Sequence, residues 1–264
     1  MPVHTDDLSA VVDLDRHPLG DPGFRANCKR ALDEHGVLVL PALLVRDAIR
    51  SIREEGESRQ ALAHYTTGTH TVYLALDDPA FPDEHPRNRH VVSSKGCITT
   101  DQIADDSALR TLYASEGFRE FLCSVLGEAA LYEYADPLSS INLHYAAEGQ
   151  ELGWHYDNSS FAITLLIERP EGGATFEYVR DVRDADAGDM AYERTGRVLD
   201  GEESVQRLAM DAGDLVLFRG RNSMHRVTPT EGGVTRMLVV LAYNTEPGVS
   251  LSESARMTFY GRLG

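Results

Sequence analysis

Cysteine is scarce in this sequence. Cys28, Cys97 and Cys123 are the only three, they lie far apart, and no two of them form a Cys-x-x-Cys pair. This spacing excludes the usual zinc-binding and dithiol redox motifs. We expect all three to be reduced and to have a structural role.

Long apolar runs and positive charge are also scarce. No stretch approaches the roughly 18–20 apolar residues that span a bilayer, and the first residues lack the basic and apolar segments of a secretory signal. Lys and Arg number 25 against 42 Asp and Glu, so the net charge is -17, which repels nucleic-acid phosphates and anionic lipids. We therefore expect a cytoplasmic protein that binds a small molecule, and neither nucleic acid nor membranes. The sequence does not predict the oligomeric state.

The composition is that of a packed globular protein, with 42% hydrophobic and 25% charged residues in 264. No internal repeat and no linker rich in Pro, Gly or Ser divides the chain. We predict a single domain over 1–264, with a mostly helical part at 1–130, a β core at 131–245 and a C-terminal segment at 246–264.

The N-terminal part is predicted to hold helices around one strand. Pro22 can open a helix and Gly36 can end it, and Ser107 and Gly127 bound a second segment with apolar residues at helical spacing. Residues 66–106 contain three prolines and are expected to be a long loop that covers a site. The predicted elements are a helix at 22–35, a strand at 37–40, a helix at about 45–64 and a helix between Ser107 and Gly127.

From about Leu131 the pattern changes to short β-rich runs separated by turn residues. Seven or eight such strands predict a sandwich or a jelly roll, mainly β with flanking helices. The acidic stretch 181–189 is expected to be a solvated loop. The predicted strands are 131–134, 141–146, 161–167, 174–179, 205–210, 215–219 and 235–243.

Trp154-His155-Tyr156-Asp157 is the sharpest chemical feature. Residues i and i+2 of a strand point to one face, so the His155 imidazole and the Asp157 carboxylate would project together and could bind one metal ion. His4-Thr5-Asp6 has the same spacing, but it lies in a polar terminus without a strand pattern, where we expect solvated surface.

Seventy residues later, His225 follows a predicted strand and could supply a third ligand. Two imidazoles and one carboxylate on a β scaffold match the facial triad that holds non-haem Fe(II) and leaves three coordination positions open. A turn around Glu231-Gly232 would pair Arg236 with Val227 or Pro229 and place it on the face of His225. An inward guanidinium without an acidic neighbour favours a ligand carboxylate as its partner, whereas Arg226 would face the opposite way.

At this point the chain resembles the Fe(II)- and 2-oxoglutarate-dependent oxygenases, most closely the prolyl-4-hydroxylase-like branch, over about residues 131–243. The resemblance implies a double-stranded β-helix (jelly-roll, cupin-like) core, with Fe(II), 2-oxoglutarate and O2 as cofactors. It also implies that Arg236 pairs with the distal carboxylate of 2-oxoglutarate, and that Tyr145 and Asn142 contact the cosubstrate, although Tyr145 could equally be a core residue. The motifs that carry the resemblance are Tyr145-Ala-Ala-Glu-Gly149, His155-Tyr-Asp157, Glu171-Gly-Gly-Ala-Thr-Phe176, Gly213-Asp-Leu-Val-Leu-Phe218, His225-Arg-Val-Thr-Pro229 and Arg236.

The C-terminal half is also similar to a branch of free-amino-acid hydroxylases and radical halogenases. Relatives that chlorinate carbon have Gly or Ala in place of the carboxylate ligand, so the presence of Asp157 disfavours halogenation. A small zwitterionic substrate would need charged anchors, for which Arg87, Arg89 and Glu133 are candidates beside their alternative as solvated surface charges.

The resulting interpretation is an oxygenase that hydroxylates an unactivated C–H bond of a small molecule, a free amino acid or a related metabolite. Desaturation and ring closure are further outcomes of the same chemistry. A cupin-type metal dioxygenase that does not use 2-oxoglutarate would share the fold and the triad but would not need Arg236. A jelly roll that binds a small molecule without catalysis is the third hypothesis.

Overall fold

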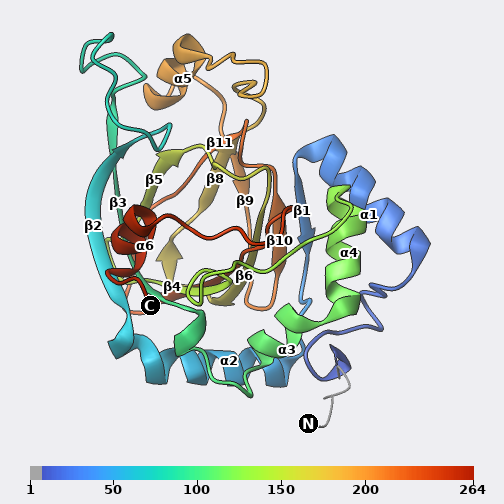
Figure 1. Cartoon of the computed structure of the whole chain (residues 1–264). Helices are drawn as coiled ribbons and strands as arrows, with labels where there is room; N and C mark the ends of the chain where they lie inside the picture. Colours follow the sequence, from blue (N-terminus) through green and yellow to red (C-terminus); the bar gives the residue numbers. More distant parts are fainter. Residues whose placement is uncertain (1–7) are drawn as a thin grey trace.

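The computed structural model describes residues 8–264, so the His4-Thr5-Asp6 motif lies outside the described residues. Figure 1 shows a curled antiparallel sheet with helices along its flanks. The helices are α1 (Pro22–His35), α2 (Arg46–Arg59), α3 (Ala108–Ala114), α4 (Glu116–Leu126), α5 (Tyr192–Leu199) and α6 (Glu253–Tyr260), with 3-10 turns at Leu8–Ala10, Gln60–Leu62 and Thr100–Gln102. The strands are β1 (Val37–Leu40), β2 (His64–Thr71), β3 (His90–Ile98), β4 (Ile141–Ala146), β5 (Leu152–His155), β6 (Ala162–Glu168), β7 (Gly172–Gly173), β8 (Phe176–Val179), β9 (Gln206–Leu208), β10 (Leu215–Phe218), β11 (Met224–Val227), β12 (Thr230–Glu231) and β13 (Arg236–Leu241).

The main sheet has 11 strands, in the order β1-β10-β6-β13-β4-β3-β5-β11-β8-β9, with β2 paired to β3. Strand β3 joins the two halves of the curl, because Gly96 pairs with Tyr145 of β4 whereas Ser93 pairs with Leu152 of β5. This arrangement is a half-barrel of the double-stranded β-helix type with flanking helices, and it confirms the predicted fold class.

The two faces of the central strands have different environments. Leu143 and Tyr145 of β4 and Val239 of β13 belong to the large core cluster, which also contains Ile52 of α2. Because side chains alternate along a strand, His144 lies on the opposite face, toward the inside of the curl. Helices α1 to α4 thus cover the outer face and leave the inner face for a site.

Local sequence signals account for the helix boundaries. The Asp21 side chain accepts a hydrogen bond from Phe24 N at the start of α1, and Gly36 ends that helix at φ 70°. The predicted helix between Ser107 and Gly127 is in fact two helices. Ser115 breaks it, because its side chain accepts from Phe118 N and so caps α4.

The prediction of a single loop over 66–106 is wrong at two places, 66–71 and 90–98. The segment contains strand β3 and most of β2, which pair in register from His64↔Cys97 to Thr71↔His90. The prolines that suggested a loop are confined to the connection between these strands. The helix predicted to reach His64 ends at Arg59, and the part at 1–130 contributes three strands to the sheet.

Two further predictions on the β core need correction. Residues 131–134 form only an isolated bridge, Tyr132↔Asn244. The hairpin predicted around Glu231-Gly232 is absent, because β11 pairs with β5 and β8 whereas β13 pairs with β4 and β6. Strand β12, between β11 and β13 in the sequence, pairs with β7, so β11 and β13 do not pair with each other. Helix α5, after the acidic loop, was not predicted.

The three cysteines are unpaired, and Cys28 and Cys97 are buried. Among the helices of residues 8–264, none is both long enough and apolar enough to cross a membrane.

Candidate metal centre

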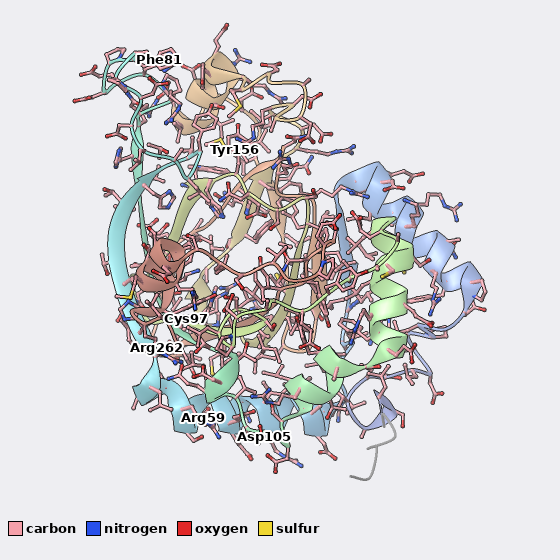
Figure 2. The ribbon with its side chains drawn as sticks, viewed as in Figure 1. Arg59, Phe81, Cys97, Asp105, Tyr156 and Arg262 are labelled. Atoms are coloured by element: carbon pink, nitrogen blue, oxygen red, sulfur yellow. The ribbon has the colours of Figure 1, made fainter. Side chains whose placement is uncertain are left out.

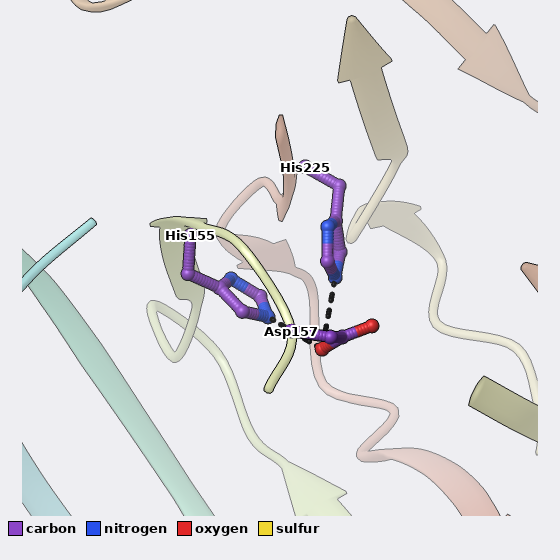
Figure 3. Close-up of side chains that lie close together, drawn as sticks. All are labelled: His155, Asp157 and His225. Carbon is purple, nitrogen blue, oxygen red and sulfur yellow. Dashed lines mark ion pairs between the residues drawn. The ribbon is translucent and has the colours of Figure 1, made fainter. Parts of the chain in front are cut away.

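Two paired strands, β5 and β11, bring the triad residues together inside the curl (Figure 3). His155 is the last residue of β5, Asp157 follows two residues later, and His225 lies on β11 directly opposite His155 in the register. The ring centroid of Phe218 on β10, in the other half of the sheet, lies 4.8 Å from that of His225. The site therefore lies between the two halves of the curled sheet.

The ligand atoms of the triad converge. The Nε2 atoms of His155 and His225 lie 3.8 Å and 3.6 Å from Oδ1 of Asp157. Each imidazole is held from behind, since Nδ1 of His155 lies 2.8 Å from the carbonyl oxygen of Gly153 and Nδ1 of His225 lies 3.1 Å from that of Ser223. An Nδ1–H that donates to a carbonyl leaves Nε2 with a free lone pair directed at the other two groups, which is how histidine ligands are oriented in metal sites.

Asp157 occupies a tight recess against the β10–β11 connection. Its backbone N–H donates to the carbonyl oxygen of Gly220, and its Oδ2 is buried without a hydrogen-bond partner. A Cβ at Gly220 would lie 1.8 Å from that Oδ2 atom. The chain thus makes room for the carboxylate and leaves a buried oxygen unsatisfied, which is costly unless another group binds it.

The electrostatics suit a metal ion. Burial, followed by the neighbouring His225, lowers the pKa of His155 to about 3, so this imidazole is neutral near pH 7. Burial by itself would raise the pKa of Asp157, but His225 and His155 outweigh it and hold this pKa below its usual value. Neutral imidazoles and an ionised carboxylate are the protonation states that bind a divalent cation. The donor set therefore fits Fe(II) in a facial triad.

Two tyrosines that hydrogen-bond to the same threonine support the other face of the His-x-Asp segment. The hydroxyl groups of Tyr156 and Tyr73 lie 2.8 Å and 3.0 Å from Oγ1 of Thr195 on α5. The Arg183 guanidinium lies 4.1 Å from the Tyr156 ring centroid. Figure 2 shows Tyr156 at the end of the curl near α5 and the loop that carries Phe81. This support depends on the unpredicted helix α5.

Arg236 is buried on the inner face of β13, but for a different reason from the one expected. It pairs with Ala146 of β4, so it lies on the same face as His144. Its side chain has no hydrogen bond or ion pair with any residue of 8–264, and burial lowers its pKa to about 10. Arg236 lines a cavity of about 300 Å³ together with Phe176 and Leu208. A buried guanidinium without a counter-charge is a receptor for an anion.

Tyr145 does not contact the inside of the curl. It pairs with Met237, one residue out of phase with Arg236, and its hydroxyl donates to the carbonyl oxygen of Gly56 in α2 at 2.7 Å. The expected cosubstrate contact is therefore wrong, and Tyr145 is a core residue. Asn142 does lie on the inner face, but its amide already donates to the carbonyls of Leu138 and Ile141.

The expected substrate anchors lie elsewhere, and none has a described contact with the triad. Arg89 forms an ion pair with Asp200, and Arg87 donates to the carbonyl oxygen of Leu76. Glu133 is exposed.

Two inner-face residues were missed by sequence reasoning. Lys95 of β3 lies with its Nζ 3.4 Å from Nδ1 of His144. Both line a second cavity of about 190 Å³, beneath α6. The sequence offered one reason to single out Lys95: Lys29 and Lys95 are the only lysines in the chain.

Comparisons with known proteins agree with this geometry. The model of the family described as "HalD: Halogenase D" matches residues 24–258, and no curated protein matches the chain. A 2OG-Fe(II) oxygenase family oxidoreductase from Burkholderia pseudomallei is 13% identical, with a TM-score of 0.54 over 87% of this chain and 95% of that chain. The alpha ketoglutarate dependent epimerase SnoN from nogalamycin biosynthesis is 13% identical, with a TM-score of 0.59 over 84% of each chain. A Pseudomonas putida prolyl-4-hydroxylase is 14% identical, with a TM-score of 0.50 over 82% of this chain and 96% of that chain.

The likeness to these structures shows a shared fold, and the family model adds membership over most of the chain. The chain therefore belongs to the halogenase D family, within the superfamily of Fe(II)- and 2-oxoglutarate-dependent oxygenases.

Proposed function

We propose that this protein hydroxylates an unactivated C–H bond of a small molecule, a free amino acid or a related metabolite, with Fe(II), 2-oxoglutarate and O2. The observation that carries the proposal is the convergence of His155, Asp157 and His225, whose ligand atoms lie within 4.8 Å of one another. When bound, Fe(II) supplies the activation of O2 that couples oxidation of the substrate to conversion of 2-oxoglutarate into succinate and CO2.

The chain's own residues have separate roles in this proposal. His155, Asp157 and His225 hold the metal from one side, and the carbonyls of Gly153 and Ser223 keep the two imidazoles in the ligating tautomer. Arg236 binds the distal carboxylate of 2-oxoglutarate through its unpartnered guanidinium. The aromatic rings of Phe176 and Phe218 beside His225 exclude water from this part of the site.

The presence of Asp157 favours hydroxylation over halogenation, although the description of the matched family names a halogenase. Its carboxylate fills the ligand position that halogenating relatives leave to chloride. The recess at Gly220 is shaped around this carboxylate, since a Cβ there would collide with it. Arg236 in turn favours 2-oxoglutarate dependence over a cupin dioxygenase, because that alternative does not explain a buried cation without a partner.

Anoxic titration of the protein with Fe(II) and 2-oxoglutarate tests the proposal. We expect a weak visible charge-transfer band that needs both components, and succinate formation that depends on the substrate when O2 and free amino acids are supplied. His155→Ala, Asp157→Ala and His225→Ala should each lose iron binding with the fold retained, as measured by metal content and circular dichroism. Wild-type metal content in all three variants would refute the triad.

A further test separates hydroxylation from halogenation. Asp157→Gly with added chloride should lose hydroxylation, because a coordination position is freed. Hydroxylation at the wild-type rate in this variant would contradict the role of Asp157.

A further inference from the structure

Strand β2 forms one margin of the main sheet, and its outward edge is unpaired (Figure 1). It pairs with β3 along its whole length, from His64 to Thr71, and with no other described strand. Between Tyr65 and His70 the backbone has no described backbone hydrogen bond apart from those to β3. About half of the N–H and C=O groups of such a strand point away from its partner, so β2 presents about 27 Å of unpaired edge.

The chain around this edge carries no charge. Residues 60–76 contain no Asp, Glu, Lys or Arg, although 25% of the whole sequence is charged. Proteins commonly protect an exposed edge with charged side chains, proline or a very short strand. Strand β9, at one end of the strand order, shows such protection, because it is three residues long and carries the exposed Arg207. Strand β2 has eight residues and none of these features.

Exposed apolar side chains gather along the same edge. On the outer face, Tyr65 is 46% exposed, and Val92, which lies on β3 opposite Thr69, is 44% exposed. On the inner face, α6 packs against β2, since a Cβ at Gly261 would lie 2.6 Å from the His64 ring. Of the ten exposed large apolar side chains in residues 8–264, six belong to β2, β3, α6 or positions within three residues of them: Leu62, Tyr65, Val92, Met257, Phe259 and Leu263.

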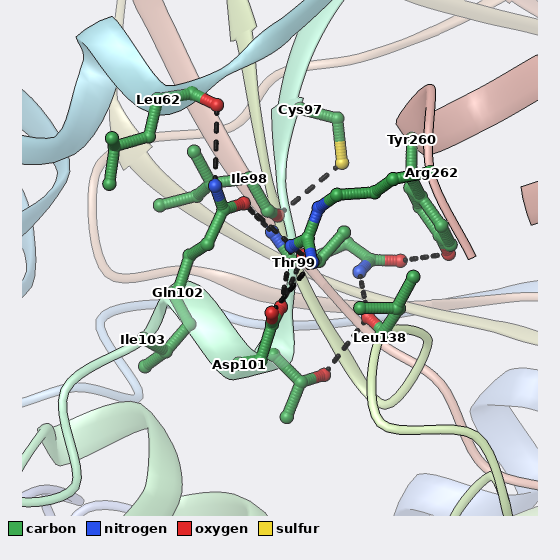
Figure 4. A network of polar contacts seen from close by, with 12 residues as sticks. Leu62, Cys97, Ile98, Thr99, Asp101, Gln102, Ile103, Leu138, Tyr260 and Arg262 are labelled. Atoms are coloured by element: carbon green, nitrogen blue, oxygen red, sulfur yellow. Dashed lines mark hydrogen bonds and ion pairs between the residues drawn. The ribbon is translucent and has the colours of Figure 1, made fainter. Parts of the chain in front are cut away.

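Helix α6 is held beside β2 by polar contacts at its C-terminal end (Figure 4). The Tyr260 hydroxyl donates to Oδ1 of Asn142 at 2.9 Å, and the Arg262 guanidinium forms an ion pair with Asp101. The exposed apolar side chains of α6 therefore form part of the same surface as the edge of β2.

The partner of such an edge must be another strand, and a second copy of β2 fits it. Two copies related by a two-fold axis perpendicular to the sheet pair antiparallel and keep their outer faces on one side. An axis at Thr67 places Thr67 opposite its own copy and Tyr65 opposite Thr69, which are favourable cross-strand pairs. Each chain carries a net charge of -17, so two copies repel each other over most of their surface. The uncharged edge is where they approach at the lowest electrostatic cost.

We propose that two copies of this chain associate through β2, which extends the sheet across a two-fold axis with the exposed side chains of β3 and α6 beside it. This inference does not depend on the proposed function.

Sedimentation velocity of the full chain from about 1 to 100 µM tests the proposal, together with hydrogen exchange at both ends of this range. We expect the mass to approach twice the chain mass of 29.1 kDa as the concentration rises. In the dimer the edge amides of residues 65–70 should exchange more slowly by roughly tenfold or more, whereas β9 should exchange equally at both concentrations. A monomer throughout the range overturns the proposal, and so does a dimer in which residues 65–70 exchange as in the monomer.

The double variant Thr67→Lys/Thr69→Lys tests the edge itself. Both side chains are exposed on the outer face, and pairing would bring lysines of the two copies opposite each other, so the dissociation constant of the dimer should rise by at least about tenfold. The two lysines make each chain less negative than -17, so general repulsion between copies cannot account for the loss.

Gln206→Lys is the matched control, because Gln206 is an exposed residue of the edge strand β9. It should leave the dimer intact, and circular dichroism should be unchanged in both variants. A double variant that dimerises like the wild type would show that the copies meet at another face and would overturn the proposal. If the double variant does not fold, the hydrogen exchange of the wild type remains the deciding measurement.

Discussion

Arg236 shows how a single buried charged residue can indicate that a protein binds a ligand of opposite charge. Its guanidinium has no acidic partner in residues 8–264, so the protein bears the cost of a buried charge until an anion binds. Arg236→Ala should weaken 2-oxoglutarate binding by about 3–5 kcal/mol, and Arg236→Lys should recover part of this. Titration of the charge-transfer band measures both, with Fe(II) affinity in the absence of cosubstrate as the control. Normal 2-oxoglutarate binding together with a loss of iron would make Arg236 a structural cation.

His155 should make the metal-free protein sensitive to mild acid. Its pKa is about 3 in the folded state and near 6.5 in the unfolded state, so below pH 6.5 the unfolded state binds a proton that the folded state does not. The free energy of unfolding should therefore fall as the pH falls, by roughly 2 kcal/mol between pH 6.5 and 5. Urea unfolding of the metal-free protein across this range measures the slope, which should be shallower in His155→Ala. Equal slopes in the two proteins would contradict the assignment.

Substitution of Gly220 should reduce iron affinity as much as loss of a metal ligand, although Gly220 has no side chain to bind the metal. A Cβ there would lie 1.8 Å from Oδ2 and 2.6 Å from Cγ of Asp157, so Gly220→Ala must displace the carboxylate. We expect iron affinity to fall as in Asp157→Ala, with an unchanged circular dichroism spectrum. Gly233→Ala is the matched control, because a Cβ at Gly233 meets nothing within 4 Å. Wild-type iron affinity in Gly220→Ala would show that the recess is not required.

At the scale of elements, α6 is held to the sheet mainly through its C-terminal end. Arg262 donates two hydrogen bonds to the carboxylate of Asp101, both at 2.7 Å, immediately after Gly261 ends the helix. Because both side chains are partly exposed, Arg262→Ala should cost only about 1 kcal/mol, and this cost should appear as local opening of α6. Hydrogen exchange should speed up in 253–260 and remain unchanged in β13. Arg169→Ala, which breaks an exposed pair with Asp211, should leave α6 unaffected.

The strands show which elements can be predicted from the local pattern of apolar and polar residues. Strand β10 is an apolar run and strand β4 contains alternating apolar residues, and both were predicted. Strand β2 was not predicted, because its residues His64–Thr71 are largely polar and half of them are exposed, so they lack the alternation that marks a strand with one buried face. Its structure comes from pairing with β3 along its whole length.

At the scale of the whole molecule, the 11-stranded sheet joins distant parts of the chain, since β1 pairs with β10 and β3 with β4. We therefore predict that the chain unfolds as one cooperative unit, in keeping with a single domain. Far-ultraviolet circular dichroism and the fluorescence of Trp154, the sole tryptophan, should give coincident urea transitions. Two separated transitions would show that the part at 1–130 folds independently.

The sequence by itself determined the features that depend on neighbouring residues. The caps of α1 at Asp21 and Gly36 are local, and so is the spacing that projects His155 and Asp157 together, because the backbone period of a strand or helix is set within a few residues. The resemblance to the oxygenases added the superfamily and the fold class, which the comparisons and the structure confirm.

Only the tertiary structure decided how the distant groups meet. It placed His225 opposite His155, brought Arg236 inward through pairing with β4 rather than through a hairpin, turned Tyr145 toward α2, and set Lys95 in the wall of a cavity. The physical reason is that strand pairing depends on the burial of whole faces across the sheet, and a one-residue change of register reverses which side chains point inward. The local sequence pattern predicts the alternation of side chains along a strand, but it does not predict which strand pairs with it.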